Sequence, residues 1–289
     1  MGAMERLHPL AAAGYFAGVA AVAMVSMNPV LLGLSLLGSL ALSCRYGGLR
    51  GAGGFLLLGL CVAVLNPLVY HNGVTPLLIL NGQPITLEAL CYGLAAGAMI
   101  AGVGCWLRSF SRMMTSDKLM HLLGRVSPKL ALLCAMALRC GPLFSRQTAA
   151  IRRAQQGVGL YKEENLPDRI RGNSRVFSIL VTWALENSII TADSMAARGY
   201  GVGRRTAFAR YRFGRRDGMF LLLTAVLLFP PVLGLCLGAL NVSYYPALRM
   251  PAPSLLGALS YGAYAALALL PILWEGGESL KWRWLKSRI

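Results

Sequence analysis

The stretch Ser188–Gly203 reads SIITADSMAARGYGVG, an alanine-rich helical pattern that runs into alternating glycines. Glycine directly after a helix-forming run is typical of a helix C-terminus. Arg198 would therefore stand at the end of a helix whose last turn carries only small side chains. Because small side chains allow close approach and a guanidinium can form a bidentate pair with a carboxylate, we interpret this end as a contact for another protein. The alternative is that Arg198 only complements the helix dipole, an effect of ~0.3–1 kcal/mol.

The composition around this stretch is that of a membrane protein. Of the 289 residues, 56% are hydrophobic and 13% are charged, whereas soluble domains carry about 25% charged residues. The net charge is +17, and residues 108–217 hold 20 of the 28 Lys and Arg residues against 7 of the 11 acids. This excess predicts a cytoplasmic segment, since Lys and Arg remain on the cytoplasmic side of membrane proteins.

Apolar runs and turn residues predict an all-α polytopic membrane protein with about six transmembrane helices. The predicted spans are residues 10–26, 30–43, 55–70, 87–107, 219–240 and 255–274. The loop 71–86 has no Lys or Arg, so we expect it to be an irregular outer loop, with both chain termini in the cytoplasm. The chain then divides into a four-span region at 1–112, a cytoplasmic region at 113–216 and a two-span region at 217–289.

The cytoplasmic region contains two long helical patterns. The first runs from Lys129 to Arg153, with a kink or break expected at Gly141-Pro142. The second runs from Asn173 to Arg198, and the polar residues 161–172 are expected to connect the two. Both patterns are too polar at their ends to span a membrane, and we expect them to lie against the membrane domain or along the inner face of the membrane.

No motif for catalysis, metal binding or cofactor binding is present. The sequence lacks a Walker A pattern, the Rossmann glycine spacing, H-E-x-x-H and G-x-S-x-G, and its cysteines and histidines have no metal-ligand spacing. Among acids in apolar segments, Glu88 is expected to be hydrated at the outer interface. Glu186 and Asp193, seven residues apart on one helix face, are expected to pair with nearby arginines. Nucleic acid is not an expected partner, because the arginines follow apolar helices without stacking aromatics.

Four pieces of the chain resemble the transmembrane T component of energy-coupling factor (ECF) transporters, the group that includes the cobalt-transport permease of CbiQ type. They are Leu7-His8-Pro9-Leu10, Asn28-Pro29, residues 137–143 (ALRCGPL) followed by 152–155 (RRAQ), and residues 192–200 ending in MAARGYG. Their order matches the family over nearly the whole chain. The block 128–203, which resembles the family's two coupling helices, is the specific part.

The resemblance implies a coupling subunit of an ECF-type ABC importer for a vitamin or a metal ion. Its partners would be two cytoplasmic ABC-type ATPases, a small substrate-binding membrane subunit (the S component) and membrane lipid. ATP and Mg²⁺ would bind the ATPases, and this chain would be no enzyme and would bind no metal or cofactor. The alternatives are a membrane enzyme acting on lipid headgroups and a stand-alone secondary transporter, for which neither an acidic metal motif nor an inverted repeat is evident.

The same resemblance assigns the ATPase-docking residues. The second motif comprises Ala196, Ala197, Arg198 and Gly199, and the first, degenerate motif comprises Ala154, Gln155, Gln156 and Gly157. Arg139, Pro142, Arg152 and Arg153 are supporting positions on the first helix. Val158 stands where the first motif usually has arginine. Either that contact is weaker and less ionic, or Arg152, Arg153 or Lys162 supplies the charge from a neighbouring turn.

Overall fold

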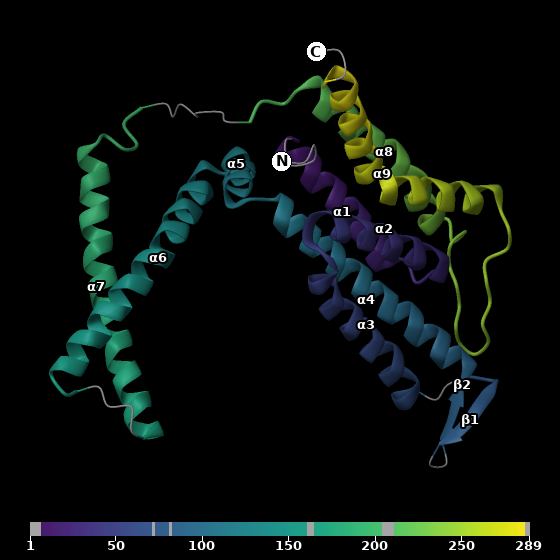
Figure 1. The fold of residues 1–289 in the computed structure, drawn as a ribbon, viewed down its shortest axis with the longest axis horizontal. Coiled ribbons are helices and arrows are strands. Elements are labelled where there is room, and N and C mark those ends of the chain that lie inside the picture. The colour runs from purple at the N-terminus through teal and green to yellow at the C-terminus, as the bar shows by residue number, and fades with distance from the viewer. Residues whose placement is uncertain (1–6, 71–72, 81–82, 161–164, 204–210, 287–289) are drawn as a thin grey trace. The chain divides into compact units, whose positions relative to one another are not determined.

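The computed structural model describes residues 7–70, 73–80, 83–160, 165–203 and 211–286. The chain forms two compact units (Figure 1). The first unit consists of residues 1–119 and 211–289, and the second unit of residues 120–210. The boundaries at residues 112 and 216 that the sequence suggests stay a prediction.

The first unit is a helical bundle with one small hairpin. Its elements are α1 (Pro9–Val25), α2 (Pro29–Gly47), α3 (Leu49–Val69), β1 (Pro76–Leu80), β2 (Gln83–Thr86), α4 (Leu87–Met113), α8 (Arg215–Cys236) and α9 (Leu255–Lys286). Within the described residues, α2, α3, α4, α8 and α9 are long and apolar enough to cross a membrane. The predicted all-α polytopic membrane fold is therefore confirmed. The remaining predicted span, α1, has 17 residues and measures about 26 Å, slightly less than the ~30 Å hydrocarbon core.

Three helices of the first unit begin where the sequence supplies a polar cap. His8 Nδ1 accepts a hydrogen bond from Leu10 N at 3.2 Å, and Asn28 Oδ1 accepts one from Val30 N at 3.0 Å. In both cases a proline follows at the first helical position, where its missing N–H costs nothing. Thr86 Oγ1 caps α4 in the same way through Ala89 N at 3.4 Å. Side-chain caps of this kind satisfy backbone donors that have no partner inside the helix.

The core of the first unit is rich in aromatic residues, which pack around α1. Tyr15 and Phe16 each contact the ring of Trp106 edge-on, with ring centroids 6.0 Å apart. The polar atoms of these rings are satisfied, since Trp106 Nε1 donates to Ser35 Oγ at 3.0 Å and Tyr15 OH donates to Leu267 O at 3.0 Å. Buried polar groups without such partners would destabilise the bundle. The core therefore joins α1, α2, α4 and α9.

Helices α3 and α4 approach closely through small residues. A Cβ built on Gly97 would lie 2.3 Å from Gly59 O and 3.1 Å from Ala63 Cβ, and one on Gly93 would lie 2.7 Å from Ala63 O. Small residues four apart allow two membrane helices to pack backbone against backbone. This contact has no room for any larger side chain.

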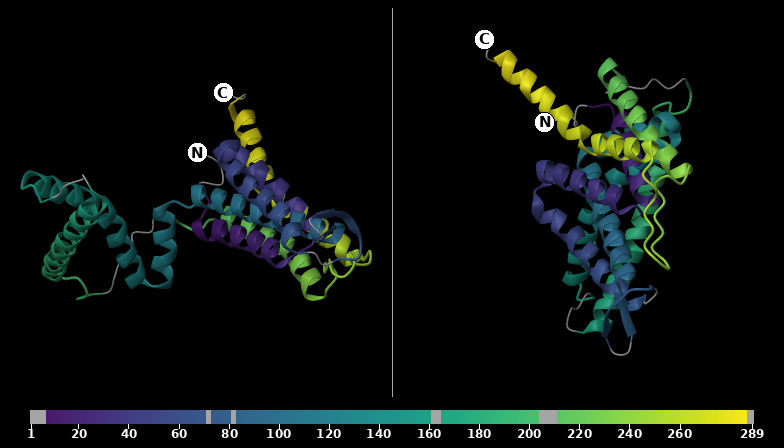
Figure 2. Two further views of the ribbon diagram at one scale, coloured as in Figure 1. Left: turned by 90° about the horizontal axis from the view of Figure 1, so that it is seen from below. Right: turned by 90° about the vertical axis from the view of Figure 1, so that its right-hand side faces the viewer.

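One end of the bundle, called the basic end here, contains the starts of α1 and α8 and the ends of α2, α4 and α9 (Figures 1 and 2). The buried Asp217 carboxylate accepts hydrogen bonds from His8 N and Gly214 N, each at 2.9 Å. Arg112 Nη1 donates to Tyr46 O at 2.7 Å. The first two bonds connect the residues before α1 to the start of α8. The third connects the end of α2 to α4.

The opposite end of the bundle is held by bonds to the turn between α1 and α2. Asn28 Nδ2 donates to Leu240 O at 3.1 Å, and Tyr244 OH donates to Met27 O at 2.6 Å. Burial raises the pKa of Tyr244 to about 12. The phenol therefore stays protonated, and able to donate, throughout the physiological range.

The prediction that residues 71–86 form an irregular loop is wrong in part. This segment contains a two-stranded antiparallel hairpin of β1 and β2. Glu88 is also not the hydrated interfacial residue that the sequence suggests, since it is only 3% exposed. Its carboxylate accepts hydrogen bonds from Thr75 Oγ1 at 2.9 Å and Thr75 N at 3.4 Å. The carboxylate is buried because it binds the residue that leads into the hairpin.

Helix α5 (Ser116–Val126) begins in the first unit and ends in the second. The second unit then continues with α6 (Pro128–Gly157) and α7 (Leu166–Ala197), which cross near the end of α6 (Figure 1). Ile151 and Val176 are buried at the crossing, and the rings of Phe144 and Trp183 meet edge-on at 6.2 Å. The pair is held by this short apolar contact.

Two predictions for the second unit are wrong in whole or in part. Helix α6 has no break at Gly141-Pro142 and continues for 30 residues with Pro142 inside it, while a kink at this point stays a prediction. Pro142 and Leu138 are exposed, so water can bind the Leu138 carbonyl that proline leaves without a backbone partner. Helix α7 begins at Leu166 rather than Asn173, because Pro167 and Asp168 in its first turn favour a helix start over a connector.

Candidate functional site

Helix α6 ends in a Schellman motif at the first predicted docking segment. Gly159 has φ +74°, its N–H donates to Gln156 O at 3.0 Å, and Leu160 N donates to Gln155 O at 3.0 Å. This pair of bonds satisfies carbonyls that the helix leaves open, and the positive φ favours glycine. Ala154, Gln156 and Gly157 are exposed and Gln155 is half-buried. The segment is therefore an ordered, accessible helix end.

Helix α7 ends in the same motif at the second predicted docking segment. Gly199 has φ +74°, its N–H donates to Ala196 O at 2.9 Å, and Tyr200 N donates to Met195 O at 3.0 Å. Ala196, Ala197, Arg198 and Gly199 are all exposed. Arg198 is the C-cap residue, so its side chain is attached at the helix end, directly before Gly199.

The hydrogen bonds of the two ends show which residues correspond to each other. Gly159 corresponds to Gly199 and Leu160 to Tyr200, which makes Val158 the counterpart of Arg198 as C-cap residue. Val158 is 74% exposed. The α6 end therefore has an exposed valine at the C-cap position where the α7 end has a cation. The difference between the two motifs in sequence is thus a difference at equivalent positions of the two helix ends.

The ends lie far apart on the helix pair. The end of α6 contacts α7 near its start, since Arg152 Nη2 donates to Asn173 Oδ1 at 3.2 Å and Arg175 Nη1 donates to Leu160 O at 3.1 Å. At 1.5 Å per residue, the stretch of α7 from Arg175 to Arg198 spans about 35 Å. The second unit therefore presents two separate exposed helix ends.

The supporting positions on α6 have different surroundings. Arg139 and Pro142 are exposed in the middle of the helix, away from the end. Arg152 is bonded to Asn173 of α7, and Arg153 Nε donates back along α6 to Ala149 O at 3.2 Å. The structure thus brings only Arg152 and Arg153 near the first motif. Lys162, the third proposed source of charge, lies outside the described residues.

Glu186 and Asp193 do not pair with arginines as the sequence predicts. Both are exposed on α7, and within the described part of the chain the one ion pair joins Arg45 to Glu275. The prediction fails because both side chains are exposed and neither meets an arginine among the described residues. The described residues also contain no group of three or more His, Cys, Asp or Glu side chains that could hold a metal ion.

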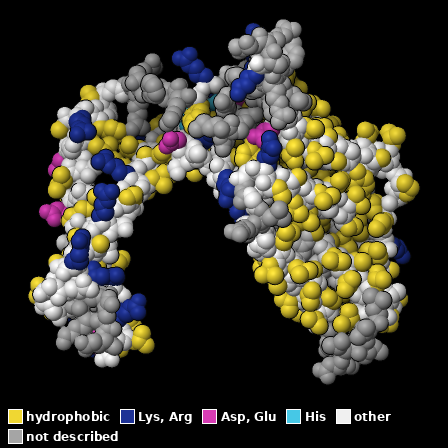
Figure 3. Space-filling model, viewed as in Figure 1, with side chains coloured by type: hydrophobic (Ala, Val, Ile, Leu, Met, Phe, Trp, Pro, Cys, Tyr) yellow, Lys and Arg dark blue, Asp and Glu magenta, His cyan; other side chains and the backbone are white. Residues whose placement is uncertain are grey.

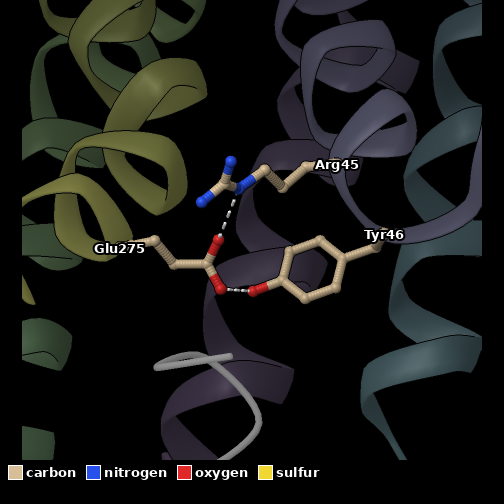
Figure 4. Close-up of polar contacts among 3 residues, drawn as sticks. All are labelled: Arg45, Tyr46 and Glu275. Atoms are coloured by element: carbon tan, nitrogen blue, oxygen red, sulfur yellow. Dashed lines mark hydrogen bonds and ion pairs between the residues drawn. The ribbon is translucent and has the colours of Figure 1, made fainter. Parts of the chain in front are cut away.

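Sequence reasoning missed the cluster of Arg45, Tyr46 and Glu275 at the basic end (Figure 4). Glu275 of α9 is 8% exposed; its carboxylate accepts a hydrogen bond from the Tyr46 hydroxyl and lies 3.5 Å from Arg45 Nε. These residues come from α2 and α9, 229 and 230 positions apart. No local pattern indicates such a contact. The cluster clamps the end of α2 to α9.

Replacing Glu275 by leucine is expected to destabilise the bundle by about 1–3 kcal/mol, because the Tyr46 hydroxyl then loses its acceptor in a half-buried position. The melting temperature of the detergent-solubilised protein, followed by circular dichroism, measures this effect. Arg45→Gln is the control, since the Arg45 side chain is 62% exposed and an exposed ion-pair partner contributes at most about 1 kcal/mol. Equal melting temperatures for the two variants would contradict the clamp.

A second residue missed by sequence reasoning is Arg175, the α7 residue that binds Leu160 O at the end of α6. It is exposed and lies outside both motifs. The sequence places Arg175 in the first half of α7 but does not show that this half contacts α6. Its role can be inferred only when the crossing of the two helices is known.

Comparison with known proteins identifies the family of this chain. The model of the family CbiQ, described as cobalt transport protein, matches residues 10–207. The match covers more than half of the chain and includes α6, α7 and both helix ends. A comparison with curated proteins gives no match. The chain therefore belongs to the CbiQ cobalt transport protein family, the family of ECF transporter T components, and is a multi-pass membrane component of that type of transport.

Proposed function

We propose that this chain is the coupling subunit of an ECF-type importer. It transmits the ATP-driven movement of two cytoplasmic ABC-type ATPases to a separate substrate-binding membrane subunit. The vitamin or metal ion binds to that subunit, and ATP and Mg²⁺ bind to the ATPases. The observation that carries the proposal is the pair of exposed Schellman ends about 35 Å apart on α6 and α7, within a chain of this family.

The geometry of the ends suits two ATPases. Each end is a capped helix terminus with small or exposed residues in its last turn, so its shape is fixed before a partner arrives. Preorganised contacts lose little conformational freedom on binding. Two such points on one helix pair allow two separate proteins to move the same rigid element.

The distribution of charge supports an orientation with the basic end in the cytoplasm. Among the described residues, Arg45, Arg108, Arg112, Arg215 and Arg216 lie at or beside this end, whereas Arg249 is the cation of the opposite loops. Apolar side chains cover much of the bundle between them (Figure 3). Because Lys and Arg remain on the cytoplasmic side, both the start of α1 and the end of α9 face the cytoplasm.

The faces of α6 and α7 support an additional membrane partner. Leu185, Ile189 and Ile190 of α7 are 60–63% exposed, and Leu133 of α6 is 60% exposed. Large apolar side chains in such numbers are unfavourable in water and mark contacts with a membrane or another protein. In the proposed assembly these faces meet the lipid surface and the substrate-binding subunit.

The proposal is tested by reconstitution in proteoliposomes. The chain is expected to give ATP-dependent uptake of Co²⁺ or a vitamin only together with two ATPases and a substrate-binding subunit. Omission of any one component is expected to reduce uptake to background. Uptake by this chain alone without ATP would refute the coupling function and support a secondary transporter.

A further inference from the structure

The end of α6 lacks the cation that the end of α7 has. Val158 occupies the C-cap position that corresponds to Arg198, and its apolar side chain is 74% exposed. If both ends bind similar grooves of the ATPases, a carboxylate in the groove at the first end would have no motif arginine to pair with. The cations around this end therefore decide how the first contact is made.

Two candidate cations are directed away from the end. Arg153 Nε donates to Ala149 O, one turn back along α6. Arg152 Nη2 donates to Asn173 Oδ1 on the neighbouring helix. These bonds hold the two guanidinium groups at Ala149 and at Asn173, before the last turn of α6, rather than at its C-cap.

Arg175 reaches this end from α7. Its Nη1 donates to the carbonyl oxygen of Leu160, the residue directly after the positive-φ glycine of the Schellman motif. The position is electrostatically favourable, because a helix C-terminus carries partial negative charge. Arg175 is also exposed. Since a guanidinium has five N–H donors, its bond to Leu160 O is compatible with a bidentate pair to a carboxylate.

We propose that Arg175 supplies the docking cation of the α6 end, in place of the arginine that Val158 replaces. The partner is a carboxylate in the groove of the ATPase that binds this end. The inference rests on the proposed coupling function and assigns the charge of the first contact to the second helix. The first contact is then a composite surface, with the apolar Val158 from α6 and the guanidinium from α7.

The experiment compares Arg175→Gln, which keeps a donor for Leu160 O but removes the charge, with wild type. Binding of the purified ATPases to the immobilised, detergent-solubilised chain is measured at low and high salt. We expect Arg175→Gln to weaken binding about 10- to 100-fold at low salt and to reduce its salt dependence. Arg171→Gln, an exposed arginine one turn earlier on α7, is expected to bind like wild type.

A double variant separates docking from local structure. Val158→Arg in the Arg175→Gln background places a cation directly at the C-cap and is expected to restore binding and its salt dependence. Wild-type binding by Arg175→Gln, or a loss that Val158→Arg does not restore, would overturn the role of Arg175. Arg198→Glu is measured in parallel. If it abolishes binding while Arg175→Gln does not, only this inference fails, whereas unchanged binding in both variants refutes the proposed function itself.

Discussion

Replacing Arg198 by glutamate is expected to weaken binding of the ATPases by ~100-fold or more and to abolish ATP-driven uptake. The arginine is exposed at the capped end of α7, where Ala196 and Ala197 allow a groove to close around it. Charge reversal would turn a bidentate attraction into repulsion between two carboxylates. Co-purification of the ATPases and uptake in proteoliposomes measure the two effects separately.

Arg249→Glu is the matched control for this variant. It makes the same change of charge at an exposed arginine between α8 and α9, at the end of the bundle opposite the basic end, and it is expected to leave both readings unchanged. Arg198→Lys should fall between the two, because an ammonium keeps the charge but cannot form a two-pronged pair. If Arg198→Glu retained full assembly and uptake, Arg198 would have no docking role and would serve only as a helix cap.

Replacing Gly97 by alanine is expected to destabilise the membrane bundle by about 1–3 kcal/mol, since the added methyl group has no space. It would lie 2.3 Å from Gly59 O and 3.1 Å from Ala63 Cβ, so α3 and α4 must separate to admit it. The melting temperature in detergent, followed by tryptophan fluorescence, is expected to fall by several degrees.

Gly33→Ala is the control for the Gly97 variant. A Cβ at Gly33 meets no atom within 4 Å, and alanine favours helix over glycine by up to about 1 kcal/mol. This variant should therefore melt at or slightly above the wild-type temperature. A Gly97→Ala protein that melted together with Gly33→Ala would show that the close approach of α3 and α4 does not limit stability.

The membrane helices and the ends of α6 and α7 could be predicted because their signals are local. Apolar runs mark the spans, His8-Pro9 and Asn28-Pro29 mark helix starts, and a glycine just beyond the last helical turn marks the ends of α6 and α7. The break considered at Pro142 is absent, because the local signal was not decisive. A proline costs a helix one hydrogen bond, but the surrounding residues still decide whether the helix continues.

What could not be predicted depends on contacts between distant segments. Glu275 is a clamp only because α9 packs against α2, and Arg175 reaches the α6 end only because the helices cross at Ile151 and Val176. Glu186 and Asp193 show the converse. They share one helix face by spacing, yet both are exposed and neither pairs with an arginine among the described residues. Spacing determines which residues lie together on a helix, and packing determines what they meet.

The off-centre crossing of α6 and α7 has a mechanical consequence. From the buried contact of Ile151 and Val176, the α6 end at Val158 is about 11 Å away along its helix, and the α7 end at Arg198 is about 33 Å away. The pair is thus a lever with unequal arms. A rigid rotation about the contact displaces the Arg198 end about three times as far as the Val158 end. Equal forces from two ATPases would therefore produce unequal torques, and the helix pair would tilt rather than only shift.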